Sequence, residues 1–313
     1  MHTHLAFGLV LFTTASAVPD EPKTLRLEHT VPLQGATGRY DHMALDAKGE
    51  QLFVANLSND SLDVIDLKAG KLMKQIRGQK KIQGIAYVPE LDRIFVGNGG
   101  DGECRCFDGK TYKLLGSVKL PDADNVRYDP IAKHVWVAHA EKMLTSLDPK
   151  TLEVKATVKL PGSPEAFQID PERKRLYVNC LKPAMVAVVD TEKAQVMSQY
   201  RLTHGDQNYP MALDRDGGRV FVGCRAKPMV VALDASSGKE LFTVDIPADI
   251  DDLFFDAKRK RLYASCGEGV LAVLEEHKVN FKLVEKIPTR KLARTCLFDA
   301  NSGRLFVVLP RTD

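Results

Sequence analysis

Two neighbouring columns of polar side chains recur about every 42 residues along this chain. The first column contains Asp41, Gln83, Asp124, Glu165, Tyr209, Asp251 and Arg294. The second column, one residue later, contains His42, Gly84, Asn125, Ala166, Pro210, Asp252 and Thr295. Carboxylates, amides, an imidazole and a guanidinium supply hydrogen-bond donors, acceptors and charges of both signs. Such a set can bind a polar ligand or a cation if the repeats bring the columns together.

Four carboxylates of the first column suggest a particular chemistry. Asp41, Asp124, Glu165 and Asp251 offer hard oxygen ligands, which suit Ca²⁺ or Mg²⁺ better than zinc. Binding without chemistry is one hypothesis. The alternative is metal-assisted hydrolysis of a lactone or ester, in which His42 or a carboxylate activates water. The sequence has no nucleophile elbow, no Ser-His-Asp order and no zinc-ligand spacing, so binding is preferred over catalysis.

The elements that position these columns repeat seven times. An aromatic-aliphatic tetrapeptide marks each unit: 53–56, 95–98, 136–139, 177–180, 221–224, 263–266 and 306–309. An acid closes an apolar triplet ahead of six of the seven copies: Asp46, Asp129, Asp170, Asp214, Asp256 and Asp299. These acids are typical of turn residues that accept hydrogen bonds from nearby backbone amides. Each unit therefore predicts four short strands rich in Val, Leu, Phe and Tyr.

Four antiparallel strands per repeat predict an all-β, seven-bladed β-propeller that occupies residues 18–313 as one domain. Residues 25–33 resemble the fourth strand of the other units, so we expect them to close the last blade. That blade has a first strand near 296–298 and a second near 304–308. Its third strand would end beyond Asp313 by the internal repeat. The last blade is then either three-stranded or encoded by a shortened reading frame.

Residues 1–17 have the pattern of a signal peptide. The apolar stretch 5–12 precedes Ala15-Ser16-Ala17, which fits an A-x-A cleavage site. No stretch of the chain is long and apolar enough to predict a membrane span. We therefore expect a periplasmic or secreted protein.

Charge and cysteine content add two expectations. The formal net charge of +3 gives no electrostatic field typical of a nucleic-acid-binding protein, and the basic hairpins at 172–175 and 258–261 are expected to be solvated turns.

Cys180, Cys224 and Cys266 fall in one repeat column, at positions about 10 Å apart in successive blades. That separation is too long for disulfides, so small buried side chains are favoured over a metal or redox site. His139 continues this column and leaves the soft-metal alternative open.

In a propeller the innermost strand of each blade lines a central channel, so both polar columns would meet at its mouth. Their chemistry differs from blade to blade, which is typical of a binding site on a repeat scaffold. The alternative is a water-filled channel lined by solvated side chains.

The tetrapeptides and their partners, such as Asp63-Val64-Ile65-Asp66, resemble the YVTN or YncE-like β-propeller family of exported bacterial proteins, whose repeats are WD40-like. Segments 38–43, 122–129, 164–167, 208–214, 251–254 and 293–295 resemble an exported subgroup. The resemblance implies a small polar ligand or a protein partner on the channel-mouth face. One member of the wider family is associated with single-stranded DNA, but this chain lacks the aromatic and basic groove that base stacking needs. The ligand-binding candidates are Arg39, Asp41, His42, Gln83, Asp124, Asn125, Arg127, Glu165, Asn208, Asp251, Asp252 and Arg294.

Overall fold

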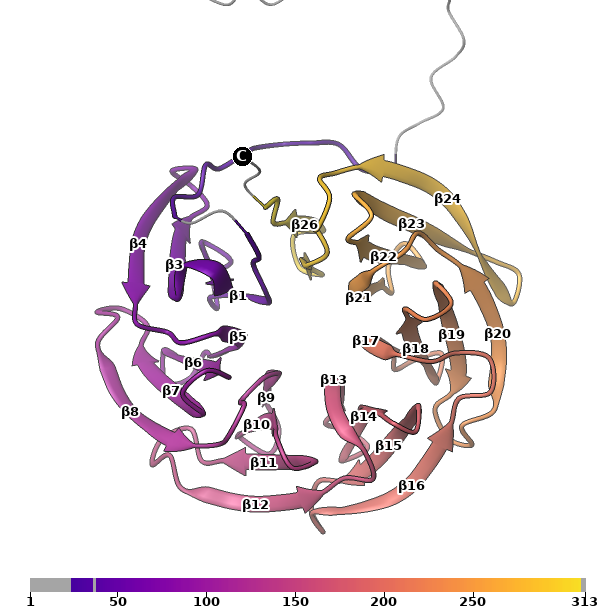
Figure 1. Ribbon diagram of the computed structural model, residues 1–313, viewed down its shortest axis with the longest axis horizontal. Coiled ribbons are helices and arrows are strands. Elements are labelled where there is room, and N and C mark those ends of the chain that lie inside the picture. Colours follow the sequence, from indigo (N-terminus) through magenta and orange to yellow (C-terminus); the bar gives the residue numbers. More distant parts are fainter. Residues whose placement is uncertain (1–23, 36–37, 311–313) are drawn as a thin grey trace, which may run out of the picture.

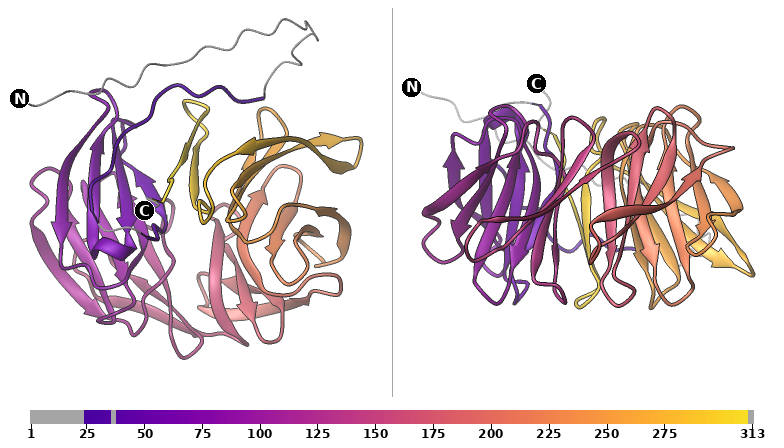
Figure 2. Two further views of the ribbon diagram at one scale, coloured as in Figure 1. Left: turned by 45° about the horizontal axis from the view of Figure 1, so that its top comes forward. Right: turned by 90° about the horizontal axis from the view of Figure 1, so that it is seen from below.

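The computed structural model describes residues 24–35 and 38–310. Apart from one 3-10 turn, Leu57–Asn59, the regular structure in these residues is entirely β-strand. The strands form six four-stranded antiparallel sheets and one two-stranded sheet, arranged like blades around a common axis (Figure 1). Seen from the side, the strands cross the thickness of a disc (Figure 2). No helix among these residues is long and apolar enough to cross a membrane.

Each four-stranded sheet follows chain order from the axis outward. The first three sheets are β1 (Met43–Leu45), β2 (Gln51–Asn56), β3 (Ser61–Asp66) and β4 (Lys71–Arg77); β5 (Ile82–Val88), β6 (Arg93–Asn98), β7 (Glu103–Asp108) and β8 (Leu114–Lys119); and β9 (Val126–Asp129), β10 (His134–His139), β11 (Met143–Leu147) and β12 (Val154–Lys159).

The other sheets continue the same pattern. They are β13 (Ser163–Asp170), β14 (Arg175–Leu181), β15 (Met185–Asp190) and β16 (Gln195–Arg201); β17 (Asn208–Asp214), β18 (Arg219–Cys224), β19 (Met229–Asp234) and β20 (Glu240–Asp245); β21 (Ile250–Asp256), β22 (Arg261–Cys266), β23 (Val270–His277) and β24 (Asn280–Pro288); and the pair β25 (Cys296–Asp299) and β26 (Arg304–Val307). The all-β, four-stranded antiparallel pattern predicted from the repeats is confirmed.

The tetrapeptides form the core because they lie in the second strand of each sheet, between two neighbouring sheets. Phe53, Trp136 and Phe221 are fully buried there. Phe221 packs on Phe281 of the adjacent sheet, with ring centroids 5.3 Å apart in an edge-to-face arrangement. Apolar side chains on both faces explain why these strands read as continuous hydrophobic runs rather than as alternating ones.

The acid that closes each first strand shapes the turn after it. The Oδ1 atom of Asp129 accepts hydrogen bonds from the amides of Ile131 and Ala132, both at 2.9 Å. Asp256 does the same for the amides of the two residues at 258 and 259, both at 3.0 Å. The prediction that this acidic column serves the turns is confirmed.

Residues 25–33 do not form the predicted outer strand. They carry no strand assignment and cross the outside of the two-stranded sheet as an extended segment (Figures 1 and 2). Side chains hold them in place: Leu25 packs against the cluster of Tyr263, Leu271 and Val273 in the neighbouring β21–β24 sheet, and Oε2 of Glu28 lies 3.3 Å from Nε of Arg304. The physical reason is the missing third strand, because an outer strand needs that neighbour's backbone groups to pair with.

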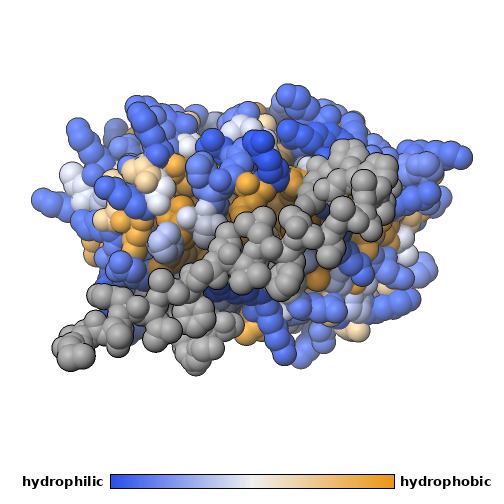
Figure 3. Space-filling model, turned by 90° about the horizontal axis from the view of Figure 1, so that it is seen from above, coloured by the Kyte–Doolittle hydropathy of each residue, from blue (hydrophilic) through white to orange (hydrophobic). Residues whose placement is uncertain are grey.

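Apolar side chains are visible at the surface on this side of the molecule, among polar ones (Figure 3). The signal-peptide prediction for residues 1–17 lies outside the described residues.

Candidate functional site

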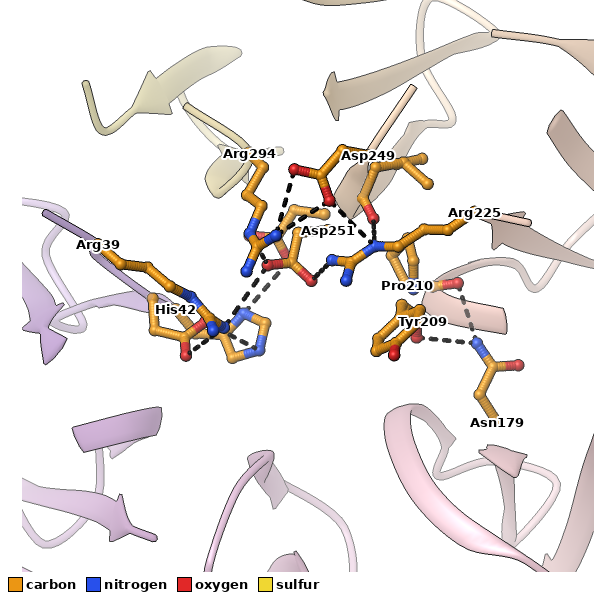
Figure 4. A network of polar contacts seen from close by, with 12 residues as sticks. Arg39, His42, Asn179, Tyr209, Pro210, Arg225, Asp249, Asp251 and Arg294 are labelled. Atoms are coloured by element: carbon orange, nitrogen blue, oxygen red, sulfur yellow. Dashed lines mark hydrogen bonds and ion pairs between the residues drawn. The ribbon is translucent and has the colours of Figure 1, made fainter. Parts of the chain in front are cut away.

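The channel mouth gathers side chains from segments that lead into the innermost strands. Arg39, His42, Tyr209, Asp251 and Arg294 meet near the centre of the ring, although they come from sheets on different sides of it (Figure 4). Backbone hydrogen bonds to its own sheet hold each segment in place. For example, the amide of residue 41 donates to the carbonyl of residue 55 at 2.8 Å. The first-column side chains at positions 209, 251 and 294 therefore lie together near the axis.

Asp251 is the centre of an arginine cluster. Its carboxylate accepts a hydrogen bond from Nη2 of Arg225, and its Oδ2 lies 2.8 Å from Nε of Arg294. Nη2 of Arg39 lies 3.8 Å from the same oxygen. The side chain of Asp251 is only 10% exposed. Three guanidinium groups thus surround one nearly buried carboxylate.

Asp249 ties two of these arginines together. Nη1 of Arg294 lies 3.0 Å from its Oδ1 and 3.2 Å from its Oδ2. Nε of Arg225 lies 3.6 Å from Oδ1 and donates to the carbonyl of Ile250 at 2.6 Å. The guanidinium carbon of Arg225 also lies 3.8 Å from the centre of the Tyr209 ring. The Arg225 side chain is therefore held from several directions.

The sequence reasoning missed two members of this cluster. Arg225 follows the fifth tetrapeptide, and the other repeats have Leu57, Gly99, Ala140, Leu181, Gly267 and Pro310 at that position. Arg225 is the one charged residue at a repeat position that is otherwise small or apolar, and this difference could have identified it from the sequence. Asp249 occupies the same repeat position as Arg39, two residues before the first column, and the two side chains have opposite charges.

His42 lies between two carboxylates. Its Nδ1 is 3.3 Å from Oδ1 of Asp252, and its Nε2 is 3.9 Å from Oδ1 of Asp41. Burial alone would lower the pKa of His42, but the negative charges of Asp252, Asp41 and Asp124 outweigh it and raise the pKa to about 10. The imidazole is consequently a cation at neutral pH. Asp41 also pairs with Arg39, whose Nη2 is 3.2 Å away.

Asp124 and Glu165 differ from the other acids of the mouth because neither forms an ion pair within the described ranges. Burial, followed by the charge of Asp41, raises the pKa of Asp124 to about 7. Burial, followed by the charges of Asp124 and Asp251, raises the pKa of Glu165 to about 8. Both carboxyls therefore hold protons that an added positive charge would release.

Two of the predicted ligand-binding residues make hydrogen bonds within the protein instead. Asn208 is fully buried, and its amide donates to the carbonyl of Met185 in the neighbouring sheet at 3.0 Å. Gln83 is 7% exposed and donates to the carbonyl of Ala123, also in the next sheet, at 3.4 Å. Their amides satisfy buried backbone carbonyls between blades, so their polarity has a packing cause rather than a ligand.

A small cavity of about 30 Å³ lies deeper in the channel. Its lining includes His42, Gly84, Asn125, Arg127 and Asp252. A Cβ atom on Gly84 would lie 2.1 Å from the backbone oxygen of residue 124, so only glycine lets the β5 and β9 segments approach this closely. The predicted residues of the second column therefore line the channel interior.

The metal hypothesis finds no preformed ligand cluster. Among residues 24–35 and 38–310, no three His, Cys, Asp or Glu side chains are grouped to hold a metal ion. Two of the four predicted ligands, Asp41 and Asp251, pair with arginines. All six cysteines are buried and unbonded, and burial raises the pKa of Cys180 to about 11. These cysteines have the burial expected of small packing side chains.

Another cavity, of about 170 Å³, lies between the β13–β16 and β17–β20 sheets. Arginines of the turns in both sheets line it. Arg173 lies 2.8 Å from Asp170, and Arg215 donates to the carbonyl of Ile169 at 3.0 Å. Because these contacts brace turns within the protein, the channel mouth is the stronger candidate site.

Fold and site together define a β-propeller-like protein with a charged channel mouth. No protein-family profile and no curated protein matches its sequence. Its structure is similar to that of Kuenenia stuttgartiensis hydrazine synthase, with a TM-score of 0.75, 15% sequence identity, and coverage of 90% of this chain and 98% of that chain. At this identity the likeness shows the fold alone.

Proposed function

We propose that this protein is an exported β-propeller that binds a small polar ligand with a positively charged group at the mouth of its channel. One observation carries the proposal: Asp124 and Glu165 are the two acids of the mouth without an ion-pair partner in the described chain. Their raised pKa values, about 7 and 8, mean that a bound cation would be accompanied by proton release. A propeller scaffold is suited to binding at this position.

An organic amine fits this pair better than a bare metal ion. Ca²⁺ takes six to eight oxygen ligands, and the described part of the mouth offers two unpaired carboxyls. Nearby Arg39 and Arg294 would repel a doubly charged ion while leaving room for hydrogen bonds to hydroxyl or carboxylate groups of a ligand. Ca²⁺ and Mg²⁺ nevertheless belong in the test, because a hydrated ion needs fewer protein ligands.

A hydrolytic function is less well supported. In the version of that mechanism that uses His42 rather than a carboxylate as the general base, His42 would have to be neutral near pH 7. Its pKa, raised to about 10 by the flanking carboxylates, keeps it protonated instead. Binding is therefore the function that the geometry supports best.

Thermal unfolding tests this proposal directly. Primary amines, amino acids, Ca²⁺, Mg²⁺ and small anions should be screened at pH 8, where both carboxyls ionise readily upon binding. A cationic ligand should raise Tm in the wild type and lose its effect in the double variant Asp124→Asn, Glu165→Gln. Asp216→Asn, which removes an exposed carboxylate with no hydrogen bond or ion pair of its own, is the control. If every cation leaves Tm unchanged, the water-filled channel is the better description.

We further propose that the two-stranded sheet is a seventh blade and that residues 25–33 complete the ring around it. The packing of Leu25 on the neighbouring β21–β24 sheet and the ion pair of Glu28 with Arg304 of β26 support this closure. The repeated tetrapeptides support membership of the YVTN, YncE-like family, and residues 1–17 support export to the periplasm or outside the cell. Mass spectrometry of the protein recovered from its host tests export. A mature chain that begins at Val18 supports it, and an intact residue 1 contradicts it.

A further inference from the structure

Arg127 places a positive charge inside the channel without a matching negative one. It lies in β9 and lines the cavity of about 30 Å³ below the mouth. Its Nε atom is buried and has no hydrogen-bond partner. The side chain forms no ion pair with any described residue, and its guanidinium carbon lies 5.8 Å from the centre of the Phe167 ring. An aromatic face holds the group in place but does not neutralise it.

The carboxylate that lines the same cavity, Asp252, already has other partners. Oδ1 of Asp252 lies 3.3 Å from Nδ1 of His42, and its Oδ2 accepts the backbone N–H of Cys296 at 2.9 Å. The charge of Asp252 supports that of Arg127 only from a distance, because the two do not form an ion pair. Neither oxygen of Asp252 is therefore paired with Arg127.

Arg127 is therefore the cation of this cavity that has no paired carboxylate among the described residues. Burial lowers the pKa of Arg127, yet a guanidinium retains its proton at neutral pH. His42 is also protonated, since its pKa is raised to about 10. His42 has Asp252 and Asp41 beside it, whereas Arg127 has no carboxylate partner in the described chain. An uncompensated buried charge is costly, so a counterion at this place would stabilise the fold.

We propose that this cavity binds a small monovalent anion of about the size of chloride between Arg127 and His42, next to Asn125. A cavity of about 30 Å³ has room for an ion of the size of one or two water molecules, which excludes phosphate and organic acids. The site lies deeper than the mouth and takes the opposite charge, so it is distinct from the proposed cation site. An anion there would also neutralise the channel beneath a bound cationic ligand.

The test compares thermal unfolding in sodium chloride and in sodium gluconate at equal ionic strength. Gluconate is too large for the cavity, so nonspecific salt effects cancel. Wild-type Tm should be roughly 3–5 °C higher in chloride once chloride exceeds its Kd about a hundredfold. Arg127→Met should abolish the difference. Arg201→Met, which removes an exposed arginine of β16, should retain it.

Two further measurements keep the outcome unambiguous. A crystal grown in bromide should show an anomalous peak in the cavity beside Arg127, which covers the case in which Arg127→Met does not fold. The double variant Asp124→Asn, Glu165→Gln should keep the chloride effect, so failure of the cation site and failure of the anion site are distinguishable. Equal Tm in both salts for the wild type, a chloride effect that persists in Arg127→Met, or a bromide crystal without that peak would each overturn the proposal.

Discussion

The guanidinium carbon of Arg225 lies 3.8 Å from the centre of the Tyr209 ring, while its nitrogens contact Asp249 and Asp251. Arg225 and Tyr209 come from the same sheet, and both acids come from the segment leading into the next one. The stacked arginine thus connects two neighbouring blades at the mouth. Because the Arg225 side chain is only 15% exposed, the contact is well shielded from solvent.

Removing the ring should weaken this junction. Tyr209→Ala is expected to lower the free energy of unfolding by about 1–2 kcal/mol, since a desolvated cation–π contact and the buried part of the ring are lost. Tyr209→Phe keeps the aromatic face and should stay within about 0.5 kcal/mol of the wild type. Urea denaturation measures both. Equal losses for the two variants would assign the effect to the hydroxyl rather than to the stack.

Neutralising the acid at the centre of the cluster should cost more. Asp251→Asn leaves Arg39, Arg225 and Arg294 without their shared counterion in a nearly buried setting. We expect a loss of about 3 kcal/mol in the free energy of unfolding. Asp216→Asn, at the exposed position used above, should change it by less than about 0.5 kcal/mol. A stable Asp251→Asn protein would show that the arginines find other partners or solvent.

The pH dependence of stability follows from the two unpaired acids. In the unfolded chain Asp and Glu ionise near pH 4, but the folded pKa values are about 7 for Asp124 and about 8 for Glu165. A raised carboxyl pKa means that the folded state binds more protons, so stability falls as pH rises from about 4 to 8. The double variant Asp124→Asn, Glu165→Gln should remove that part of the fall, on the order of several kcal/mol.

His42 acts in a different pH window. Its raised pKa contributes stability that is fully present below about pH 6.5 and is lost as pH rises towards 10. His42→Gln should therefore flatten the stability profile above pH 7 and leave the acidic limb in place. Chemical denaturation at pH 5, 7 and 9 separates the two contributions. Identical profiles in the wild type and both variants would show that these groups titrate normally.

Much of the architecture was predictable because the repeats encode it locally. Each tetrapeptide carries its own burial pattern, as Phe53 and Trp136 show, and each turn carries its own acid, as Asp129 shows. Local rules of strand and turn chemistry therefore suffice for the sheets. The outer strand predicted at residues 25–33 did not form, because closing a blade depends on a partner strand, which is not a local property.

The repeat spacing predicted that Asp251 and Arg294 lie close together, and the structure brings Oδ2 of Asp251 within 2.8 Å of Nε of Arg294. The spacing could not show that Arg225, from a different column, would reach the same carboxylate. Nor could it show that Asn208 points to a carbonyl of the neighbouring sheet. Such contacts depend on the direction and length of the side chains, and neither can be read from residue spacing along the chain.

The N-terminal segment supplies the last prediction, through two leucines of the same segment. Leu25 packs against buried side chains of β22 and β23, whereas Leu27 is 83% exposed. Leu25→Ala should lower the free energy of unfolding by about 1–2 kcal/mol, because apolar contact with this cluster is lost. Leu27→Ala should leave it within about 0.5 kcal/mol, since it removes a side chain already in water. Deleting residues 18–33 should have a larger effect and should promote aggregation, because β26 would then present an open edge. If Leu25→Ala and the deletion both unfold at the wild-type Tm, ring closure does not depend on this segment.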